Sequence, residues 1–274
     1  MGFEAGLKIL ETQTLGFSLP SDFNDPFEVT ALGLDGGNIG VRGETAAARE
    51  RFINKYAVLS LTRAPLNPLM WSHYADSHKG MVVGIDIKKA GLENIDKYII
   101  PAQRGEMIYL NSAPQKNNFF TQRTLMEIGT SEFNWQNQEQ LLKQAFLYKG
   151  LHWAYEEEVR IVKCLDNKYK LYDSDQDRQF EIDGEHWLKK MVDLATNRFI
   201  FLKTIPTNAF VEVYIGVNCY VDQIRRNSVK GGQAMMAPNL ESLKNLCLEK
   251  KIDLYNVSVN LNTWSLKRNL IQDL

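Results

Sequence analysis

The sequence has few cysteines and no long hydrophobic run. Its three cysteines lie far apart and form no C-x-x-C pair, which excludes a zinc ribbon and a thioredoxin-like motif. A low, odd cysteine count is typical of a reducing compartment, so we expect all three to be buried as small hydrophobic residues. No apolar run approaches the ~18 residues of a transmembrane helix. The first residues also lack the pattern of a secretory signal. These absences predict a cytoplasmic protein that does not enter a membrane.

An excess of charge of one sign is also missing. The 274 residues include 32 Lys and Arg and 33 Asp and Glu, which gives a formal net charge of -1. Bulk electrostatics therefore predict no strong attraction to nucleic acid or to an anionic membrane. Apolar residues make up 44% of the chain and charged residues 24%, as in an ordinary globular protein. This composition excludes wholesale disorder and a collagen-like fibre.

Apolar periodicity predicts short helices and strands that do not alternate as βαβ units. Helices are expected at residues 3–12, 44–56, 67–76, 186–197 and 239–250, and residues 116–152 are expected to be mostly helical. Strands are expected at residues 16–19, 57–62, 81–86, 105–110, 157–164, 199–204, 210–216, 253–259 and 263–267. We therefore predict an α+β fold with mixed or antiparallel sheets and flanking helices. No linker is evident, so residues 1–274 are expected to form a single domain.

A loop rich in Asp, Asn, Gly and Pro is expected over residues 20–43, and loops of this length are often functional. It contains the motif FNDPFE, residues 23–28. Asn and Asp before Pro favour a turn, because their side chains bond to nearby backbone and Pro restricts the residue before it. One interpretation is a structural corner anchored by the two flanking aromatic residues. The other is a loop at the rim of a pocket, which presents Asn24 or Asp25 to a ligand.

A second constellation is MWSHYADSHKG, residues 70–80, which holds half of the four histidines. On a helix, Trp71, Tyr74 and His78 share one face through their i, i+3 and i+7 spacing. An aromatic face of this kind can stack a flat ring such as a nucleobase or nicotinamide. His73 and His78 are five residues apart, which is poor spacing for one helical face. We therefore expect no metal site.

The same helix admits two interpretations of its polar residues. Ser72 and Asp76 share a second face at i, i+4 spacing. In one interpretation His73 is a satisfied core residue. In the other, at least one of Ser72, His73 and Tyr74 faces a ligand or takes part in catalysis.

A third constellation is WAYEEEVRI, residues 153–161. If the strand begins near Glu156, then Glu156, Glu158 and Arg160 point to one face. Two carboxylates and a guanidinium are costly to bury unless they are paired, so this face is either solvated or lines a site. The first alternative is a strand edge with a Glu–Arg pair. The second is a glutamate that binds a ribose hydroxyl or stabilises a developing cation.

Taken in order, these segments resemble an uncharacterised family of bacterial and phage proteins, domain-of-unknown-function family 2971. The resemblance is carried by LKILETQTLGFSLPSDFNDPFE (7–28), LNPLMWSHYADSHKGMVVGIDI (66–87), KGLHWAYEEEVRI (149–161) and the weaker VEVYIGVN (211–218). The family name carries no activity. The resemblance therefore implies kinship over most of the chain and leaves the function open.

The order of elements more remotely resembles the ADP-ribosyltransferase superfamily, in its toxin and RNA-modifying branches. Those proteins split the bond between nicotinamide and ribose of NAD, and a carboxylate stabilises the positive charge that develops. The resemblance implies an ADP-ribosyltransferase-like fold with NAD as substrate. The implied catalytic residues are Glu158, Glu156, His73 and Tyr74, with Tyr74 or Trp71 stacking the nicotinamide. The implied NAD-binding residues are Ser18, Asn24, Asp25, Ser60, Trp71, Ser72 and Arg160.

The amino terminus departs from the family pattern. Family members begin with a strand that reads roughly Leu-Tyr-Lys/His-Tyr before the first helix, whereas this chain starts at Met1-Gly2-Phe3, where the helix is expected. In the transferases, an Arg or His of that strand grips NAD. We therefore expect that this sequence lacks its first strand, which puts activity of this chain in doubt.

Three functions remain open at this point. The first is an NAD-dependent transferase or NAD-consuming effector of bacterial conflict, such as a toxin or an antiphage protein, with a protein or nucleic acid as acceptor. The second is a non-catalytic module that binds a nucleotide or a protein and senses infection. The third is a metal-independent nuclease that uses His73, His78 and Lys79, against which the near-neutral charge counts. A homo-oligomer or a partner within a defence system is also expected.

Overall fold

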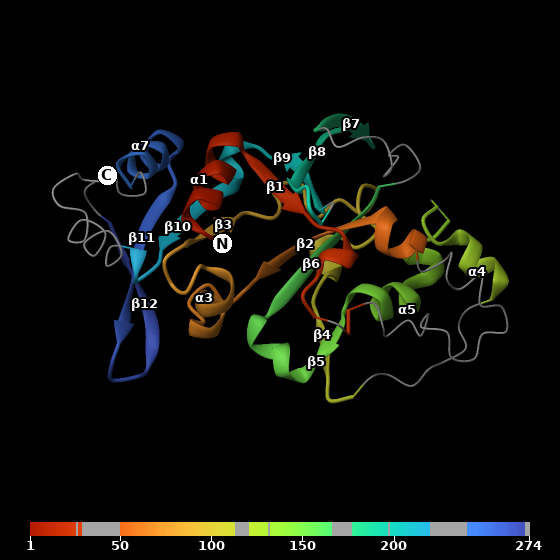
Figure 1. Ribbon diagram of the computed structural model, residues 1–274, viewed down its shortest axis with the longest axis horizontal. Helices are drawn as coiled ribbons and strands as arrows, with labels where there is room; N and C mark the ends of the chain where they lie inside the picture. The colour runs from red at the N-terminus through yellow and green to blue at the C-terminus, as the bar shows by residue number, and fades with distance from the viewer. Residues whose placement is uncertain are drawn as a thin grey trace. The chain divides into compact units, whose positions relative to one another are not determined.

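The computed structural model describes residues 1–25, 27–28, 50–112, 121–130, 132–165, 177–196, 198–219 and 240–271 (Figure 1). Two compact units can be distinguished by their internal contacts. Unit 1 comprises Met1–Thr14, Arg63–Gly91 and Ile205–Leu274, and unit 2 comprises Leu15–Thr62 and Leu92–Thr204. Each unit combines helices with mixed or antiparallel strand pairs, so the predicted α+β class is confirmed.

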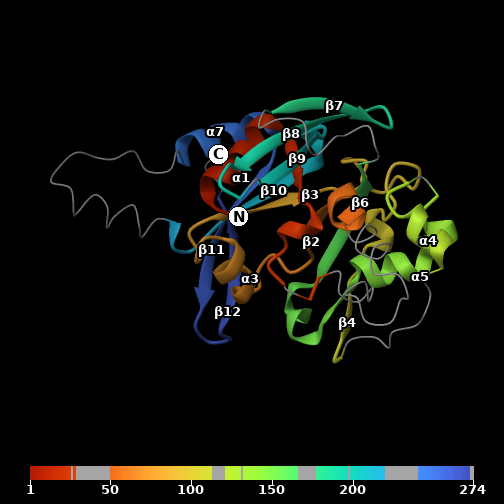
Figure 2. The ribbon, with the colours of Figure 1, turned by 45° about the vertical axis from the view of Figure 1, so that its right-hand side comes forward.

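Unit 1 is built on a four-stranded sheet in the order β12-β11-β10-β3. Its elements are α1 (Phe3–Thr12), α3 (Pro68–Tyr74), β3 (Met81–Ile85), the 3-10 helix η5 (Thr207–Ala209), β10 (Phe210–Ile215), α7 (Leu240–Lys250), β11 (Asp253–Asn260) and β12 (Ser265–Leu270). Strands β10 and β11 are parallel, and their connection includes α7, because parallel neighbours need a crossover. Helices α1 and α7 contact each other and pack on β3 and β11, respectively (Figures 1 and 2).

The helices of unit 1 follow local sequence rules. In α1 the buried side chains Phe3, Leu7 and Leu10 recur at helical spacing, as predicted. Helix α3 begins after Asn67, whose side-chain oxygen accepts a hydrogen bond from the Leu69 N–H at 2.9 Å, and Pro68 occupies its first position. Both predicted helices are therefore present.

Unit 2 contains the sheet β1-β9-β8-β7, the antiparallel pair β2-β6 and the parallel pair β4-β5. Its strands are β1 (Thr14–Phe17), β2 (Tyr56–Thr62), β4 (Ile108–Leu110), β5 (Tyr148–Gly150), β6 (Glu158–Cys164), β7 (Arg178–Ile182), β8 (Glu185–Asp193) and β9 (Arg198–Thr204). Its helices are residues 50–55, α4 (Gln122–Glu127), α5 (Trp135–Phe146) and the 3-10 helices η1 (Pro20–Asp22), η3 (Ala102–Arg104) and η4 (Leu151–Glu156). An aromatic core that includes Phe52, Tyr56, Phe133 and Phe146 packs α5 against β2 and β6.

The helix predicted over residues 186–197 is wrong, because residues 185–193 form strand β8. Asp183 and Gly184 both have positive φ, and they join β7 to β8 as a two-residue hairpin turn. Trp187 and the lysine at position 189 point inward on β8. The prediction failed because a buried lysine breaks the apolar alternation that marks a strand.

The prediction that residues 116–152 are mostly helical is confirmed in the described part of that range, which holds α4, α5 and the start of η4. The helical residues are divided between two separate helices, α4 and α5, and α5 ends at Phe146. Residues 148–150 then form strand β5, whose backbone pairs in parallel with β4. The predicted strand at 16–19 begins two residues earlier, as β1, and the loop predicted over 20–43 lies mostly outside the described residues.

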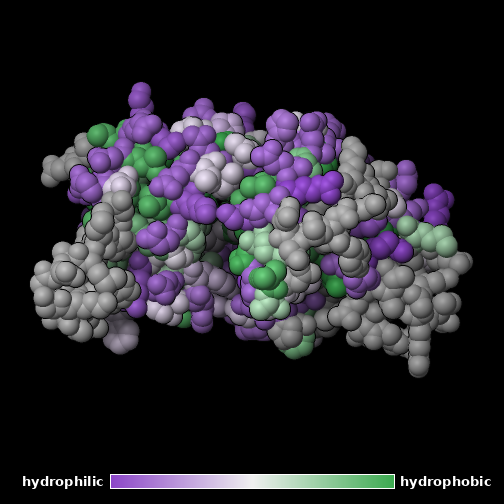
Figure 3. Space-filling model, turned by 45° about the horizontal axis from the view of Figure 1, so that its top comes forward, coloured by the Kyte–Doolittle hydropathy of each residue, from purple (hydrophilic) through white to green (hydrophobic). Residues whose placement is uncertain are grey.

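The described surface mixes polar and apolar residues. On the face shown in Figure 3, hydrophobic residues occur in small groups among hydrophilic ones. No helix in the described part of the chain is long and apolar enough to cross a membrane. Cys219 and Cys247 are buried, as expected, whereas Cys164 is half-buried. The cytoplasmic location and the single domain stay predictions.

Candidate functional site

The candidate site is built on strand β6, whose β-branched sequence EVRIVKC favours an extended conformation. Strand β6 pairs with β2 so that Glu158 lies opposite Thr62 and Arg160 lies opposite Ser60. Side chains alternate along a strand, so Glu158 and Arg160 point to the same face. They are only 6% and 2% exposed. The predicted shared face is therefore present for these two residues, and it is buried rather than solvated.

The side chain of Glu156 lies beside that of Glu158, although Glu156 is not part of the strand. It is the last residue of η4, and Glu157 after it has a φ of 44°, so the strand begins only at Glu158. The condition for Glu156 to share the strand face, a strand that begins near Glu156, is therefore not met. Its side chain is nevertheless buried and joins Glu158 through a shared cation, Lys149.

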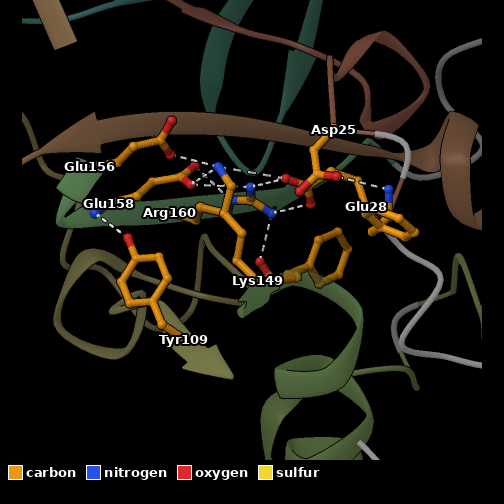
Figure 4. A network of polar contacts seen from close by, with 9 residues as sticks. Asp25, Glu28, Tyr109, Lys149, Glu156, Glu158 and Arg160 are labelled. Carbon is orange, nitrogen blue, oxygen red and sulfur yellow. Dashed lines mark hydrogen bonds and ion pairs between the residues drawn. The ribbon is translucent and has the colours of Figure 1, made fainter. Parts of the chain in front are cut away.

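The FNDPFE motif forms a corner. The Asp25 carboxylate accepts a hydrogen bond from the Phe27 N–H at 2.9 Å, and the Glu28 N–H donates to the Asp25 carbonyl at 3.1 Å. This turn directs the Glu28 carboxylate onto Arg160, which donates to its two oxygens at 2.8 and 2.5 Å (Figure 4). The ring of Phe23 lies 5.0 Å from the guanidinium carbon. The motif therefore acts as a structural corner that supplies a carboxylate.

The Arg160 guanidinium is bonded on every side. Its Nε donates to Glu158 at 2.7 Å, one terminal nitrogen donates to Glu158 at 3.3 Å, and the other donates to the Phe146 carbonyl at 2.9 Å. Together with the two bonds to Glu28, these contacts clamp two carboxylates that are 130 residues apart in the sequence. Planar, multidentate pairing of this kind fixes the geometry as well as the charge.

Lys149 of β5 connects the remaining carboxylates. Its ammonium lies 2.6 Å from Glu156, 2.9 Å from Glu158 and 3.9 Å from Glu28, and 5.0 Å from the centre of the Trp153 ring. We call Glu28, Lys149, Glu156, Glu158 and Arg160 the charge cluster (Figure 4). With three carboxylates and two cations, the cluster carries a formal charge of -1 when all five groups are ionised.

The electrostatics of the cluster keep Glu158 ionised. Burial alone would raise the pKa of the Glu158 carboxyl, but the charges of Arg160 and Lys149 and the Arg160 hydrogen bond outweigh it and lower that pKa to about 2. Burial lowers the pKa of the Lys149 ammonium, yet Glu158 and Glu156 more than compensate and the net shift is upward. Tyr109 completes the surroundings, because its hydroxyl accepts the Glu158 N–H at 2.9 Å.

This depressed pKa predicts that unit 2 loses stability in acid. A carboxyl whose pKa falls from 4.5 in the unfolded chain to about 2 in the folded protein stabilises the fold above pH 4.5, and that contribution is lost as the pH falls toward 2. The loss is expected to reach about 3 kcal/mol. Urea unfolding measured between pH 7 and pH 2.5 tests this for the wild type and for Glu158→Gln. The variant should lose markedly less stability over that range, and equal losses would contradict the assignment.

Ser60 connects the charge cluster to the surface. It is exposed, lies opposite Arg160 on β2, and its hydroxyl bonds to the Glu158 carboxylate, which helps to lower the pKa of that group. Ser18 forms a backbone bridge to Val58, two residues from Ser60 on the same strand. Asn24, in the FNDPFE corner, is exposed. Unit 2 therefore brings together Glu156, Glu158, Arg160, Asp25 and Ser60 from the predicted set, with Asn24 at the adjoining corner, whereas Ser18 is placed only by its backbone bridge to Val58.

The other predicted residues belong to α3 of unit 1. Trp71 is 1% exposed, packs with Tyr214 and Val257, and donates from its indole to the Pro65 carbonyl at 2.7 Å. These contacts favour a core role over ring stacking on a ligand. Ser72, His73 and Tyr74 are exposed. The rings of His73 and Tyr74 meet edge to face at 6.3 Å.

The helical face predicted for Asp76 and His78 is wrong. Helix α3 ends at Tyr74, and Asp76, Ser77 and His78 all have positive φ. The His78 N–H instead bonds back to the Trp71 carbonyl at 3.2 Å. Burial lowers the pKa of the His78 imidazole, and its Nδ1 has no hydrogen-bond partner among the residues that the structure describes.

Sequence reasoning missed Glu28, Lys149, Phe23 and Tyr109 as parts of the site. Glu28 closes the FNDPFE motif, but the argument from turn chemistry addressed only the residues before proline. Lys149 precedes the EEE run without any periodic relation to it. A physical signal points to Lys149: two carboxylates and one arginine on a buried face leave an unbalanced negative charge, so a further cation is required. That signal does not point to Glu28, which is itself a carboxylate.

The fold and the charge cluster define an α+β protein with a buried ionic network. Within it, residues 70–161 match the family "Protein of unknown function (DUF2971)", over about a third of the chain. The match includes residues 70–74 of α3 and the Lys149, Glu156, Glu158 and Arg160 members of the cluster, and it supports the resemblance to this family drawn from the sequence. No curated protein and no solved structure matches the chain significantly. Among the described residues, no group of three His, Cys, Asp or Glu side chains is arranged to hold a metal ion.

Proposed function

We propose that the charge cluster is the centre of an NAD-consuming, ADP-ribosyltransferase-like enzyme that serves in bacterial defence or as a toxin. In this reaction the bond between ribose C1′ and the nicotinamide nitrogen breaks, and its electron pair leaves with nicotinamide. A nucleophile of the acceptor, or water, then bonds to C1′ and gives up a proton. The protein's task is to stabilise the positive charge that develops on the ribose.

The observation that carries this proposal is a carboxylate kept ionised in a buried place. Glu158 has a pKa of about 2, so it is negatively charged at every physiological pH. Arg160 and Lys149 fix its position and act as positioning residues, since their atoms bond to the carboxylate. Ser60 is exposed and bonds to the same carboxylate, which provides the approach from solvent.

A nicotinamide-release assay tests the proposal. The full chain is incubated with NAD, with and without cellular RNA and lysate, and free nicotinamide is quantified by chromatography. We expect Glu158→Gln to reduce release about 100-fold or more, as loss of a transition-state charge contact does. Ser60→Ala should reduce release several-fold and lower the melting temperature only slightly, because the residue is exposed although its hydroxyl bonds to the Glu158 carboxylate.

Glu157→Gln is the matched control, since Glu157 is the exposed neighbour in the same EEE run. It should release nicotinamide like the wild type. Turnover that survives in folded Glu158→Gln would remove the enzymatic proposal. So would the absence of release from a folded wild type under all of the conditions named.

A non-catalytic binding module is the second candidate, and one observation favours it. Both oxygens of Glu158 are already bonded within the charge cluster, which ties the FNDPFE corner to β6. Because the hydrogen bonds of Glu158 are made within the protein, the cluster holds the corner and β6 rigidly, which suits recognition of a ligand. This candidate predicts that NAD or another nucleotide raises the melting temperature saturably while no nicotinamide is released. The same assay therefore separates the two candidates.

A further inference from the structure

The hairpin formed by β11 and β12 in unit 1 has an apolar, exposed tip. Trp264 is 91% exposed and Leu261 is 81% exposed, and Val259, near the end of β11, is 48% exposed. The end of this hairpin projects beyond α3 and β10 of the same unit (Figures 1 and 2). Large apolar side chains that gather at one exposed place mark an interaction surface. We call residues 259–270 the hairpin surface.

The backbone of the tip indicates that Trp264 does not serve the stability of the turn. Its φ of 52° lies in the left-handed region, which Gly and Asn adopt far more readily than a bulky residue. Hydrogen bonds fix the rest of the tip. The Asn262 N–H donates to the Asn260 side chain at 3.1 Å, and the hydroxyl oxygen of Thr263 lies 2.8 Å from that of Ser265. A tryptophan at this position is costly for the free protein, and contact with a partner gives it a physical reason.

Strand β12 forms one edge of its sheet. In the order β12-β11-β10-β3, no other described strand lies on the outer side of β12. The Ile271 N–H donates to the Leu254 carbonyl at 2.9 Å, so these two residues form a hydrogen-bonded pair. Such pairs alternate with non-hydrogen-bonded ones, so Leu266, Arg268 and Leu270 direct their N–H and C=O groups to the open side. This row of backbone groups is a template for one more strand.

The open edge is also positively charged. Residues 254–271 include Lys267 and Arg268 but no Asp or Glu. Lys267 is exposed, and the Arg268 side chain is 46% exposed and bonds to Glu212 of β10 at 2.9 Å. Because the two cations are consecutive on a strand, one stands on each face of the sheet. A strand added to β12 therefore meets a cation on either face, and acidic side chains at those positions are favoured.

We infer that the hairpin surface binds an extended acidic segment of a partner protein, which adds a strand to β12 and contacts Leu261 and Trp264 as apolar anchors. Backbone hydrogen bonds supply affinity, and the two cations select acidic side chains. The inference does not depend on the proposed function.

The same observations disfavour two other occupants. A second copy of this chain, paired through the full length of β12, would set Lys267 and Arg268 against the same cations of its partner. A lipid surface offers no hydrogen bonds to an open strand edge, which is why such edges do not occur within the hydrocarbon of a bilayer.

A synthetic peptide tests the inference. The probe is the fluorescein-labelled peptide VTEEVTL, whose two glutamates lie opposite Arg268 and Lys267 in an antiparallel pairing and whose leucine reaches the tip. Its binding to the full chain is measured by fluorescence anisotropy. We expect saturable binding that the lysine counterpart VTKKVTL does not show. Methylation of the backbone nitrogens of the first glutamate and the second valine should abolish binding, because these N–H groups face β12.

Lys267→Glu is the sharpest variant, because it reverses one exposed charge of the edge. Its affinity for VTEEVTL should fall at least tenfold, and it should bind VTKKVTL more tightly than the wild type does. Trp264→Gly should also weaken binding of VTEEVTL, while its melting temperature stays the same or rises because glycine suits the turn. Lys88→Glu is the matched control, since Lys88 is exposed and follows β3 at the other edge of the sheet. It should bind like the wild type.

Four results would overturn the inference. The first is a folded wild type that does not bind VTEEVTL, and the second is binding that Lys267→Glu and Trp264→Gly leave unchanged. The third is a wild-type dimer, detected by light scattering, that Trp264→Gly converts to a monomer, since a second copy then covers the hairpin surface. The fourth is binding to vesicles of phosphatidylcholine and phosphatidylserine that Trp264→Gly abolishes, since a lipid surface is then the occupant.

Discussion

Replacing Arg160 with methionine is expected to lower the free energy of unfolding of unit 2 by about 3–5 kcal/mol. Methionine fills a similar volume but removes the guanidinium that bonds to Glu28, Glu158 and the Phe146 carbonyl. The two carboxylates then remain buried with Lys149 as their nearest cation, and an uncompensated buried charge is costly. Urea denaturation followed by circular dichroism measures the loss.

The control is Arg123→Met, which removes an ion pair with Glu127 in which the arginine side chain is 86% exposed. That change should cost no more than about 0.5 kcal/mol, as exposed i, i+4 pairs do. Combining Arg160→Met with Glu158→Gln should cost less than the sum of the single changes, because the second substitution removes one of the unpaired charges. A loss below about 1 kcal/mol for Arg160→Met would mean that water reaches the charge cluster and that its ionic contacts are weak.

Only the local parts of the charge cluster, a strand face and a turn, could be predicted from the sequence. The two-residue period of a strand placed Glu158 and Arg160 on one face, and turn chemistry predicted the FNDPFE corner. Neither rule joins the corner to the strand, because Glu28 and Arg160 are 132 residues apart. Such a pairing depends on the tertiary fold, and a single sequence carries no local signal for it.

The fold shows the same division between local and long-range information. Helix α1 was predictable because its apolar residues recur at helical spacing, and α3 because Asn67 and Pro68 mark its start. Strand β8 was mistaken for a helix because Lys189, a residue type that is usually exposed, is buried there at 1% exposure. The Asp183-Gly184 turn signal was present in the sequence and outweighs the apolar pattern in this hairpin.

Trp71→Ala is expected to destabilise unit 1 by about 3–5 kcal/mol. The side chain is 1% exposed and packs with Ala75, Tyr214, Val257 and Leu266, so its removal leaves a large cavity. It also deprives the Pro65 carbonyl of its indole donor at 2.7 Å. Trp71→Phe keeps most of the apolar volume and should cost less than alanine. Urea denaturation measures both variants.

The same substitutions decide between the two roles considered for α3. If Trp71 were the residue that stacks nicotinamide, Trp71→Ala would reduce NAD binding in a protein of nearly unchanged stability. The packing predicts the opposite result. Trp71→Ala should lower the stability of unit 1, whereas Tyr74→Ala should leave it nearly unchanged, because Tyr74 is 39% exposed. Of the two aromatic residues of α3 for which stacking was predicted, only Tyr74 is exposed. In a Tyr74→Ala protein of wild-type stability, unaltered NAD affinity would leave the helix with no part in binding that ligand.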